Sequence, residues 1–501
     1  MNKLLSMYEH QDRPELDYPG GPKTRMVCDV AVIGGGGSGL VAAVRAAQRG
    51  ASVIVVEKMD QPGGNSWLAG GLLTTYSKFQ KELGMPDMTN EYYKTAYRQN
   101  KYTLDPAIFR RYIGNTGTFY EWMADLGLDT DNIRYVMDAV AMVKERKDPG
   151  YLNNPQYGPG LMGSTILSVV LEAMKDLPIQ VLLSTKAEGL LTGEDGAVTG
   201  LTAKGQDADY EICAGNVILS SGGFGCNTEL LRRFLPKYFS RDTYCSHYCL
   251  LSTTGDGIAM AERIGAEVGK NISVGLGALA HNPGSFSIQK LFRSAKGVIV
   301  NRNGVRFVAE DDTDDAEVAV DMQPEGLAYY IFDEAMKPVL YQEAVDGARF
   351  GDAMPPMEQL DADLLREHGE GKVRIARTLA EAAQFIGTDE QTLADTLSRY
   401  NAMCENKLDD ELFKDPAELV KIESFPLYVI RCQRNFDVTM GGVSIDAHLR
   451  ALMPDGTPIG GLYVTGDLAS NWMGEEYGPL FSSFAWAMNS GYLAGEEVTP
   501  Q

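Results

Sequence analysis

The stretch CDVAVIGGGGSGLVAAVRAAQRGASVIVVEK, residues 28–58, predicts the fold of the chain. Its apolar run at 30–33 is typical of a buried strand. The Ala-rich residues from Ser38 onward predict a helix, and SVIVVEK predicts a second strand that ends in Glu57. Between the first strand and the helix lies a G-x-G-x-x-G pattern made by Gly34, Gly36 and Gly39. The order strand, glycines, helix, strand, acid indicates a βαβ unit that binds a dinucleotide, rather than an ordinary glycine-rich turn.

Each residue of this pattern has a physical role. The first glycine makes a tight turn, the second lets the backbone approach a pyrophosphate, and the third lets helix and strand pack closely. The N-terminus of the helix faces the phosphates. Glu57 is expected to accept hydrogen bonds from the adenosine ribose. The pattern alone leaves both NAD and FAD open.

Composition excludes several classes of partner. The chain has 501 residues, of which 44% are hydrophobic and 23% charged, as expected for a globular protein with a sizeable core. The length suggests two to four structural units. The net charge is −23, so we expect neither nucleic acid nor an anionic membrane surface as a partner.

The sequence also predicts a cytoplasmic protein. We find no run of 18 apolar residues that would span a membrane, and the first 25 residues do not resemble a signal peptide. The seven cysteines are scattered, which suits a reducing compartment. CSHYC at 245–249 lacks the spacing of haem and common zinc sites, so we expect no metal.

Several later segments have clear local patterns. Residues 216–227 predict a strand that runs into paired glycines, and residues 252–269 predict a turn followed by a helix. Residues 296–308 predict a hairpin around Asn303-Gly304. Residues 378–401 predict two helices joined at Gly387, the second capped by Thr388 or Asp389.

Eight motifs follow one another in order from about residue 27 to the C-terminus. They are GGGGSG with Glu57, GGNSWLAGG (63–71), SSGGFG (220–225), TGDG (254–257), VNRNGVRFVAE (300–310), RYN (399–401), TMGG (439–442) and GLYVTGD (461–467). With these motifs the chain resembles the flavoprotein subunits of fumarate reductase and succinate dehydrogenase. The resemblance is to the soluble branch, which includes urocanate reductase and 3-ketosteroid dehydrogenases.

The resemblance implies an α/β fold, in which a Rossmann-type FAD-binding domain is interrupted by an inserted α+β capping domain. The expected parts are an N-terminal extension (1–26), the FAD-binding domain (27–275 and 438–501) and the capping domain (276–437). The substrate is expected between the isoalloxazine ring of FAD and the cap.

The resemblance also assigns the cofactor contacts. The expected FAD-binding residues are Gly34, Gly36, Gly39, Glu57, Lys58, Gly64, Asn65, Ser66, Gly70, Gly71, Ala187, Gly223, Asp256, Asp467, Ser482 and Ser483. The segment 63–71 contains no histidine for a covalent link, so we expect non-covalent FAD. We find neither a haem motif nor a second glycine fingerprint. The electrons are therefore expected from an external donor, which is a reduced nicotinamide, a free flavin or a redox protein.

The chain departs from this family at the substrate. Its fumarate reductases bind two carboxylates with arginine and histidine and protonate carbon with a further arginine. Here Asp314 and Asp315 replace the expected Arg-Asp pair, Asp437 lies where a histidine is expected, and Tyr477-Gly478 replaces an arginine. Anionic substrates would meet acidic residues instead of cations. These replacements favour a small neutral organic substrate.

Three further residues are candidates for the same site. Arg293 matches an arginine of the family's proton-relay path, and His281 matches a substrate-binding histidine if a gap is allowed. Tyr248 precedes the TGDG turn and is a candidate to line the pocket.

A mechanism for a neutral substrate follows from these residues. EEYGPLF (475–481) resembles the Y-P-G segment of ketosteroid dehydrogenases. This resemblance implies that the Tyr477 hydroxyl and the Gly478 backbone N–H hold a carbonyl oxygen, which polarises the bond for hydride transfer at flavin N5. Repulsion between Asp314 and Asp315 is expected to keep one carboxyl protonated, so that it donates a proton to carbon or to a leaving hydroxyl. The second possibility resembles tetrahydrodaidzein reductase. Alternatively, 310–317 is a solvated loop and Arg293, Tyr477 or Asp437 supplies the proton.

The resulting prediction is an FAD-dependent oxidoreductase of the CH–CH type. It would reduce or dehydrogenate a neutral ring substrate that carries a carbonyl group or is polyphenolic or steroid-like. Two alternatives remain at this point: a fumarate- or urocanate-type reductase of an unsaturated acid, and an electron-transfer flavoprotein subunit.

Overall fold

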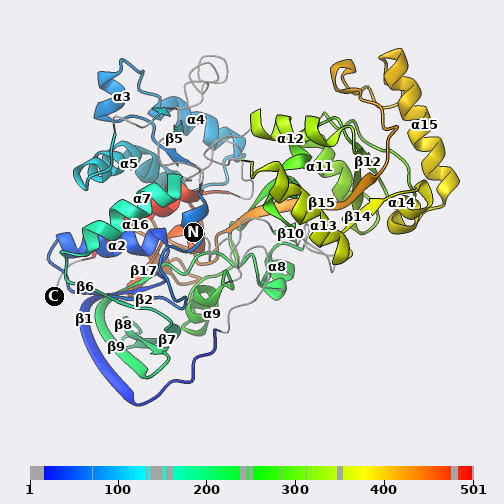
Figure 1. Ribbon diagram of the computed structural model, residues 1–501. Helices are drawn as coiled ribbons and strands as arrows, with labels where there is room; N and C mark the ends of the chain where they lie inside the picture. Colours follow the sequence, from blue (N-terminus) through cyan, green and yellow to red (C-terminus); the bar gives the residue numbers. More distant parts are fainter. Residues whose placement is uncertain are drawn as a thin grey trace.

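A computed structural model describes most of the chain. It covers residues 16–69, 71–130, 134–135, 151–153, 162–236, 245–246, 252–281, 284–311, 313–346, 354–474 and 483–498. Two hydrophobic cores form within these residues, one running from Cys28 to Val274 and from Phe436 to Val498, the other from Leu279 to Cys432. Figure 1 shows the two corresponding parts side by side.

The first part is built on an eight-stranded sheet with the strand path β16-β17-β9-β1-β2-β6, to which β8 and β7 are added beside β9. Its strands are β1 (Lys23–Ile33), β2 (Val53–Val56), β6 (Ile179–Leu182), β7 (Lys186–Thr192), β8 (Val198–Lys204), β9 (Asp209–Leu219), β16 (Arg450–Leu452) and β17 (Pro458–Val464). Strand β1 is parallel to both β2 and β9. The predicted order of strand, helix and parallel strand is therefore confirmed.

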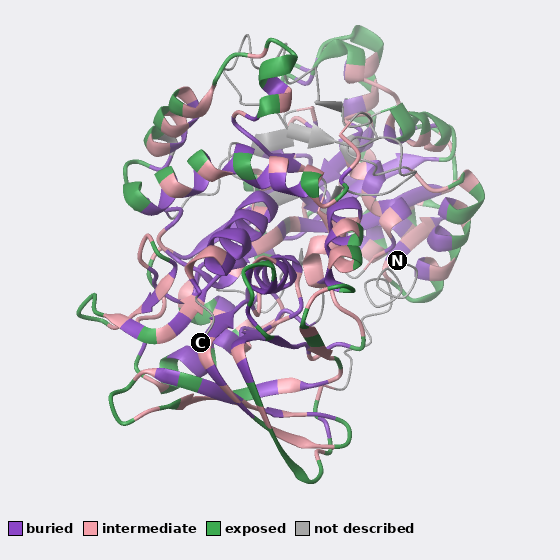
Figure 2. Cartoon of the chain, turned by 90° about the vertical axis from the view of Figure 1, so that its left-hand side faces the viewer, coloured by how far each residue is buried: buried purple, intermediate pink, exposed green. Residues whose placement is uncertain are grey.

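Helices cover this sheet and extend beyond it. They are α2 (Gly37–Gln48), α3 (Lys78–Glu82), α4 (Thr89–Gln99), α5 (Pro106–Asp125), α7 (Met162–Met174), α8 (Thr228–Phe234), α9 (Asp256–Arg263) and α16 (Ser483–Glu497). A small sheet of β3 (Leu72–Leu73), β5 (Tyr151–Asn153) and β4 (Arg134–Tyr135) lies in the same part. Helices α2 and α16 are buried along almost their whole length. Figure 2 shows such fully buried helices in the middle of the molecule.

The second part has its own sheet with the path β10-β15-β13-β12, and β11 and β14 also pair with β15. The strands are β10 (Cys245–Ser246), β11 (Ser273–Ala280), β12 (Val298–Val300), β13 (Ala328–Asp333), β14 (Val373–Ala376) and β15 (Leu427–Met440). The helices are α10 (Phe286–Gln289), α11 (Thr313–Asp321), α12 (Lys337–Asp346), α13 (Met357–Gly369), α14 (Leu379–Ile386) and α15 (Glu390–Asn406). The first part contains the short 3-10 turns η1 (Gly64–Leu68) and η5 (Gly466–Leu468). The second part contains η2 (Lys290–Arg293), η3 (Pro324–Gly326) and η4 (Pro416–Glu418).

Strand β15 connects the two parts. Its first half, up to Cys432, pairs with β13 and β14, and its second half pairs with β11 and β10. In Figure 1 it crosses from the second part toward the first. The predicted domain boundaries, 275/276 and 437/438, fall inside β11 and β15, and they stay predictions. Residues 23–26, assigned above to the N-terminal extension, form the start of β1.

The local expectations have mixed outcomes. Asp389 caps α15 by accepting a hydrogen bond from Thr392 N–H, and Gly387 ends α14 in a left-handed conformation. The Asn303-Gly304 turn is present, since Gly304 N–H donates to the Asn301 carbonyl. The second strand of the expected hairpin, however, is reduced to a single bridge between Val300 and Arg306. The Arg306 side chain at this bridge forms a buried ion pair with Glu310.

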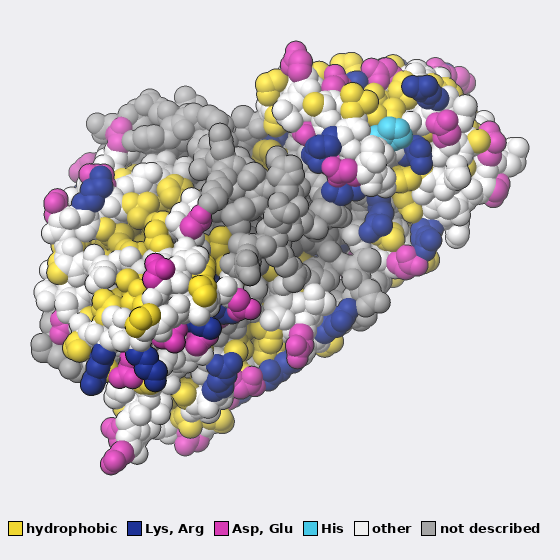
Figure 3. Space-filling view, turned by 60° about the horizontal axis from the view of Figure 1, so that its bottom comes forward, with side chains coloured by type: hydrophobic (Ala, Val, Ile, Leu, Met, Phe, Trp, Pro, Cys, Tyr) yellow, Lys and Arg dark blue, Asp and Glu magenta, His cyan; other side chains and the backbone are white. Residues whose placement is uncertain are grey.

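The surface has mixed charge on the side shown in Figure 3, where basic side chains lie among acidic ones. Among the helices of the described residues, none has the length and apolar character needed to cross a bilayer. The same residues contain no cluster of His, Cys, Asp and Glu suited to a metal ion. The His247 and Cys249 positions lie outside the described residues.

Candidate functional site

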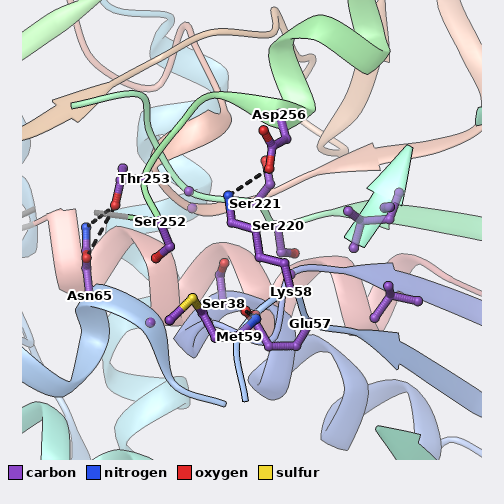
Figure 4. Close-up of a pocket in the computed structure, with 18 of the residues that line it drawn as sticks. Ser38, Glu57, Lys58, Met59, Asn65, Ser220, Ser221, Ser252, Thr253 and Asp256 are labelled. Atoms are coloured by element: carbon purple, nitrogen blue, oxygen red, sulfur yellow. Dashed lines mark hydrogen bonds and ion pairs between the residues drawn. The ribbon is translucent and has the colours of Figure 1, made fainter. Parts of the chain in front are cut away.

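A cavity opens at the carboxyl ends of β1, β2 and β9. Ten of the predicted FAD residues line it: Gly34, Gly36, Glu57, Lys58, Gly64, Asn65, Ser66, Ala187, Asp256 and Asp467. Figure 4 shows side chains from separate segments pointing into it. The carboxyl edge of a parallel sheet is where such folds bind nucleotides.

The three fingerprint glycines occupy the positions that their roles require. Gly34 has φ +102°, and a Cβ there would overlap the Ser220 carbonyl group. A Cβ on Gly39 would overlap the Gly34 carbonyl oxygen, so this glycine allows α2 and β1 to pack closely. A Cβ on Gly36 would meet no protein atom within 4 Å, and Gly36 lines the cavity. The space beside Gly36 is therefore available to the pyrophosphate of a dinucleotide.

Glu57 is held at the end of β2 by backbone donors. Its carboxylate accepts hydrogen bonds from Gly35 N–H (2.6 Å) and Met59 N–H (2.8 Å). Burial raises the pKa of Glu57, which these two hydrogen bonds oppose. Each carboxylate oxygen keeps a second lone pair, so Glu57 retains the capacity to accept from a ribose hydroxyl.

An ion pair between Lys58 and Asp256 joins β2 to the start of α9 beside the cavity. The Lys58 Nζ lies 2.7 Å from Asp256 Oδ2 (Figure 4). It also lies 2.8 Å from Thr254 Oγ1. Burial opposes the charge of Asp256, but the attraction and hydrogen bond of Lys58 outweigh it and lower the pKa of this carboxyl. The two predicted FAD residues thus contact each other across the chain.

Asp467 is the least satisfied acid of the cavity wall. Its Oδ1 atom is buried and has no hydrogen-bond partner within the described residues. Burial raises the pKa of Asp467 to about 7. A buried acceptor without a partner is costly, and a ligand hydroxyl that donates to it removes that cost. The cavity therefore fits FAD on two independent counts, the open space at Gly36 and the unsatisfied acceptor at Asp467.

The six remaining predicted FAD residues have different outcomes. Gly39, Gly71, Gly223 and Ser483 are described but do not line the cavity, whereas Gly70 and Ser482 lie outside the described residues. Other lining residues were missed, including Ser220, Ser221, Ser252 and Thr253. The first pair follows directly after a predicted strand, and that position was a usable signal because ligands bind beyond the carboxyl ends of parallel strands.

Several substrate-site candidates have no described side chain. Asp314 and Asp315 lie in the first turn of α11, and Arg293 ends η2, but their side chains are outside the described residues. Tyr248 and the pair Tyr477-Gly478 also lie outside them. The alternative that 310–317 is a solvated loop is wrong for the parts described. Glu310 is buried in an ion pair with Arg306, and the chain is helical from Thr313.

The contacts of His281 speak against the substrate-binding role predicted for it. Its ring is buried, with Nε2 2.6 Å from Glu367 Oε2 and Nδ1 2.9 Å from the Arg431 carbonyl oxygen. The ring therefore lies between a carboxylate oxygen and a backbone carbonyl oxygen, both of which are protein groups. The histidine joins the end of β11 to α13 and β15, and both of its nitrogens are already engaged.

Asp437 lies at an irregular point of β15. Its neighbours Phe436 and Val438 pair with Leu276 and Gly275, which are adjacent on β11. Asp437 is thus the extra residue of a β-bulge, and bulges redirect side chains and occur beside active sites. The side chain is partly exposed. The prediction that Asp437 contacts substrate stays a prediction.

Comparisons with known proteins agree with this geometry. The family described as "FAD binding domain" matches residues 29–477. The chain is 29% identical to the NADH:fumarate oxidoreductase of Klebsiella pneumoniae over 88% of its length, but it spans only 44% of that longer protein. It is 27% identical to the vinyl phenol reductase of Lactiplantibacillus plantarum, covering 94% of this chain and 96% of that one. It is 28% identical to the urocanate reductase of Eggerthella lenta, covering 89% and 70%.

Solved structures show the same fold. The open conformation of a flavocytochrome c3 fumarate reductase matches with a TM-score of 0.75 at 24% identity, over 94% of this chain and 78% of that one. The 3-ketosteroid delta1-dehydrogenase from Sterolibacterium denitrificans matches with a TM-score of 0.71 at 20% identity, over 94% and 99%. The chain belongs to the FAD binding domain family and is an FAD-dependent oxidoreductase.

Proposed function

We propose that the chain reduces a carbon–carbon double bond of a neutral substrate that carries a ring and a carbonyl or phenol group. The observation that carries the proposal is that Asp437, on β15, lies where the resemblance implies a substrate-binding histidine. At 436–438 the chain has Phe436, Asp437 and Val438, and Phe436 is buried. A carboxylate substrate placed against Asp437 would be repelled.

The two acids in the first turn of α11 are part of the same proposal. Helix α11 packs on β11 and β15, and its first turn contains Asp314 and Asp315. Two neighbouring carboxyl groups repel each other's charge, so one of them is favoured in the protonated form. A protonated carboxyl is able to donate to a carbon or a leaving hydroxyl. The acid would then be a carboxyl in place of the arginine that the fumarate reductases use.

One of the relatives is consistent with a neutral substrate. The vinyl phenol reductase matches this chain over nearly its whole length, and its name specifies a neutral phenolic alkene. Bound FAD supplies hydride transfer at its N5 atom. Gly36, Glu57 and Asp467 would hold FAD, and we propose that it is bound non-covalently, since residues 63–71 contain no histidine. Tyr477 and Gly478 are proposed to hold the substrate oxygen on which charge develops.

Reduction of an unsaturated acid is the second candidate. Arg434 favours it: this side chain on β15 is 19% exposed, its Nε has no hydrogen-bond partner within the described residues, and Nη1 is 3.9 Å from Asp321. A weakly paired, largely buried guanidinium is suited to a carboxylate. The fumarate- and urocanate-reducing relatives add to this candidate. The cytoplasmic location and the external electron donor are part of the main proposal.

An anaerobic reoxidation experiment tests the proposal. The bound FAD is reduced with dithionite, and its absorbance is followed after addition of a vinyl phenol, a ketosteroid enone, urocanate or fumarate. Rapid reoxidation by a neutral compound alone is the expected result. Rapid reoxidation by fumarate or urocanate, lost in Arg434→Met, would overturn it in favour of the acid substrate. The matched control is Arg302→Met, because Arg302 is an exposed arginine of the same part.

A further inference from the structure

We propose that the outer face of α4 and the start of α5 is a docking surface for a small acidic electron-carrier protein that reduces the bound FAD. The inference rests on the proposed function, since it concerns the source of the electrons. We call the surface the α4 patch, and its members are Tyr93, Lys94, Tyr97, Arg98, Tyr102 and Arg110.

The α4 patch carries unpaired positive charge. Lys94 and Arg98 are exposed and lie one helical turn apart on α4. Within the described residues neither of them forms an ion pair. Arg110 is exposed as well, and its guanidinium lies 4.2 Å from the centre of the Tyr93 ring. Stacking on the ring holds this cation in place while leaving its charge available.

This charge is opposite in sign to that of the chain as a whole. Residues 89–111 contain five Lys and Arg and two Asp and Glu, whereas the whole chain has 45 and 68. One of the five, Arg111, is paired with Glu497 and does not belong to the patch. One of the two acids, Asp105, is occupied as the cap of α5, where it accepts from Ala107 and Ile108 N–H. At physiological salt the Debye length is about 8 Å, so interactions between exposed charges farther apart than this are largely screened. A docked partner therefore responds to the patch rather than to the distant net charge.

The aromatic residues of the patch are typical of a protein interface. The rings of Tyr93 and Tyr97 are stacked with their centroids 5.7 Å apart. The Tyr102 ring packs edge-on against Tyr97, with 5.1 Å between the ring centroids. Tyr102 is 62% exposed. Tyrosine and arginine are enriched in interface cores because they supply contact area at low entropic cost. A protein partner uses these rings, whereas a small anion would need only the cations.

Packed rings connect the patch to the FAD cavity. The ring centroids of Tyr93 and Phe109 are 5.8 Å apart, and those of Phe109 and Tyr112 are 6.0 Å apart. The ring centroids of Tyr112 and Trp486 are 5.3 Å apart. Trp486 Nε1 donates to the carbonyl oxygen of Gly466, which lines the cavity. Asn100, at the end of α4, also accepts a hydrogen bond from Gly474 N–H. The patch is thus the outside of a continuous wall whose inner side bounds the cofactor.

The electron count needs two carriers for each turnover. Two carrier molecules each lose one electron, and FAD gains both electrons together with protons from solvent. Negative charge on the carrier matches the patch, and charge complementarity increases the association rate.

The experiment measures reduction of the FAD-loaded protein in a stopped-flow instrument, with reduced flavodoxin as the acidic one-electron carrier. In the wild type, the second-order rate constant is expected to fall about tenfold between low and high salt. The variant K94E/R98E is expected to lose about tenfold at low salt. No substrate is present, so failure here is separate from failure of the proposed substrate.

Two controls make the outcome decisive. The variant K23E/K407E changes two exposed lysines outside the patch by the same charge, and its rate is expected to stay within about twofold. A neutral deazaflavin radical is expected to reduce all variants at the wild-type rate, which would show that FAD itself is intact. Equal losses in both double variants, or a rate independent of salt, would overturn the proposal. So would a patch-dependent rate with free FMN equal to that with flavodoxin, since the occupant would then be a small anion.

Discussion

The two parts of the molecule bury charged side chains in different ways. In the FAD-binding part, Asp467 is buried with an oxygen that has no partner within the described residues. In the second part, Arg306 is 2% exposed and lies 2.8 Å from Glu310 and 2.6 Å from Asp409. Lys414 completes that cluster, 3.2 Å from Glu310.

This difference separates a ligand site from a structural cluster. A buried charge whose partners are protein groups holds elements together, as the cluster around Arg306 holds β12 to the chain after α15. A buried acceptor that lacks a protein partner and belongs to the wall of a cavity, as at Asp467, is available to a donor on a ligand. His281 belongs with the first kind, since both of its nitrogens have protein acceptors.

Replacing Arg306 should have the largest effect on stability. Arg306→Met leaves Glu310 and Asp409 buried with only Lys414 as a cation, and breaking a buried pair costs about 3–5 kcal/mol. Urea denaturation of the FAD-loaded protein measures this loss. The control Arg302→Met removes an exposed arginine and should cost about 0–1 kcal/mol. A loss for Arg306→Met as small as that of the control would mean that the cluster is not structural.

Replacing Glu367 tests whether His281 is structural. Burial raises the pKa of Glu367, but hydrogen bonds from His281 and Ser285 outweigh it and lower the value overall. Ionised Glu367 therefore stabilises the folded protein fully at pH values above its unfolded-state pKa of about 4.3. This stabilisation is lost as the pH falls through the lower pKa that Glu367 has in the folded state. Glu367→Gln should cost about 3 kcal/mol at pH 7 and progressively less toward acid pH, measured by denaturation.

A kinetic result would contradict this assignment. If Glu367→Gln left stability unchanged and raised only the KM for substrate, His281 would be a substrate-binding residue as the sequence first suggested. The control Glu370→Gln, on the exposed end of the same helix, should leave both quantities unchanged.

Replacing Asp467 should weaken FAD binding and spare the fold. A hydrogen bond to a charged group contributes about 1.5–3 kcal/mol, so Asp467→Asn should lower FAD affinity about 10- to 100-fold in fluorescence titrations. In the protein without FAD, the pKa of about 7 exceeds the unfolded value of about 3.9. The folded protein therefore binds the extra proton between these values, and its stability falls as pH rises from about 4 to 7. Asp467→Asn should abolish that slope, and an unchanged slope would exclude Asp467 as its origin.

The sequence predicted the FAD-binding part better than the second part for a physical reason. The G-x-G-x-x-G turn is local, so the roles of Gly34, Gly36 and Gly39 follow from a dozen neighbouring residues. The pairing of His281 with Glu367 joins residues 86 positions apart, and no local pattern predicts it. The interpretation of 310–317 as a solvated loop failed at Glu310 for the same reason. Glu310 is neutralised by Arg306 and by Lys414, a residue from a distant segment.

Lys58 is the intermediate case, since its charge is paired although it lines the FAD cavity. Its side chain is 15% exposed and that of Asp256 24%, so solvent screens the pair and its energy should not exceed about 1 kcal/mol. Lys58→Met should therefore lower FAD affinity only about threefold, and the decrease should shrink at high salt. Lys81→Met, on the exposed side of α3, is the control. A loss as large as that of Asp467→Asn would mean that the Lys58 ammonium contacts FAD directly and that pairing within the protein does not distinguish structural charges from ligand-binding ones.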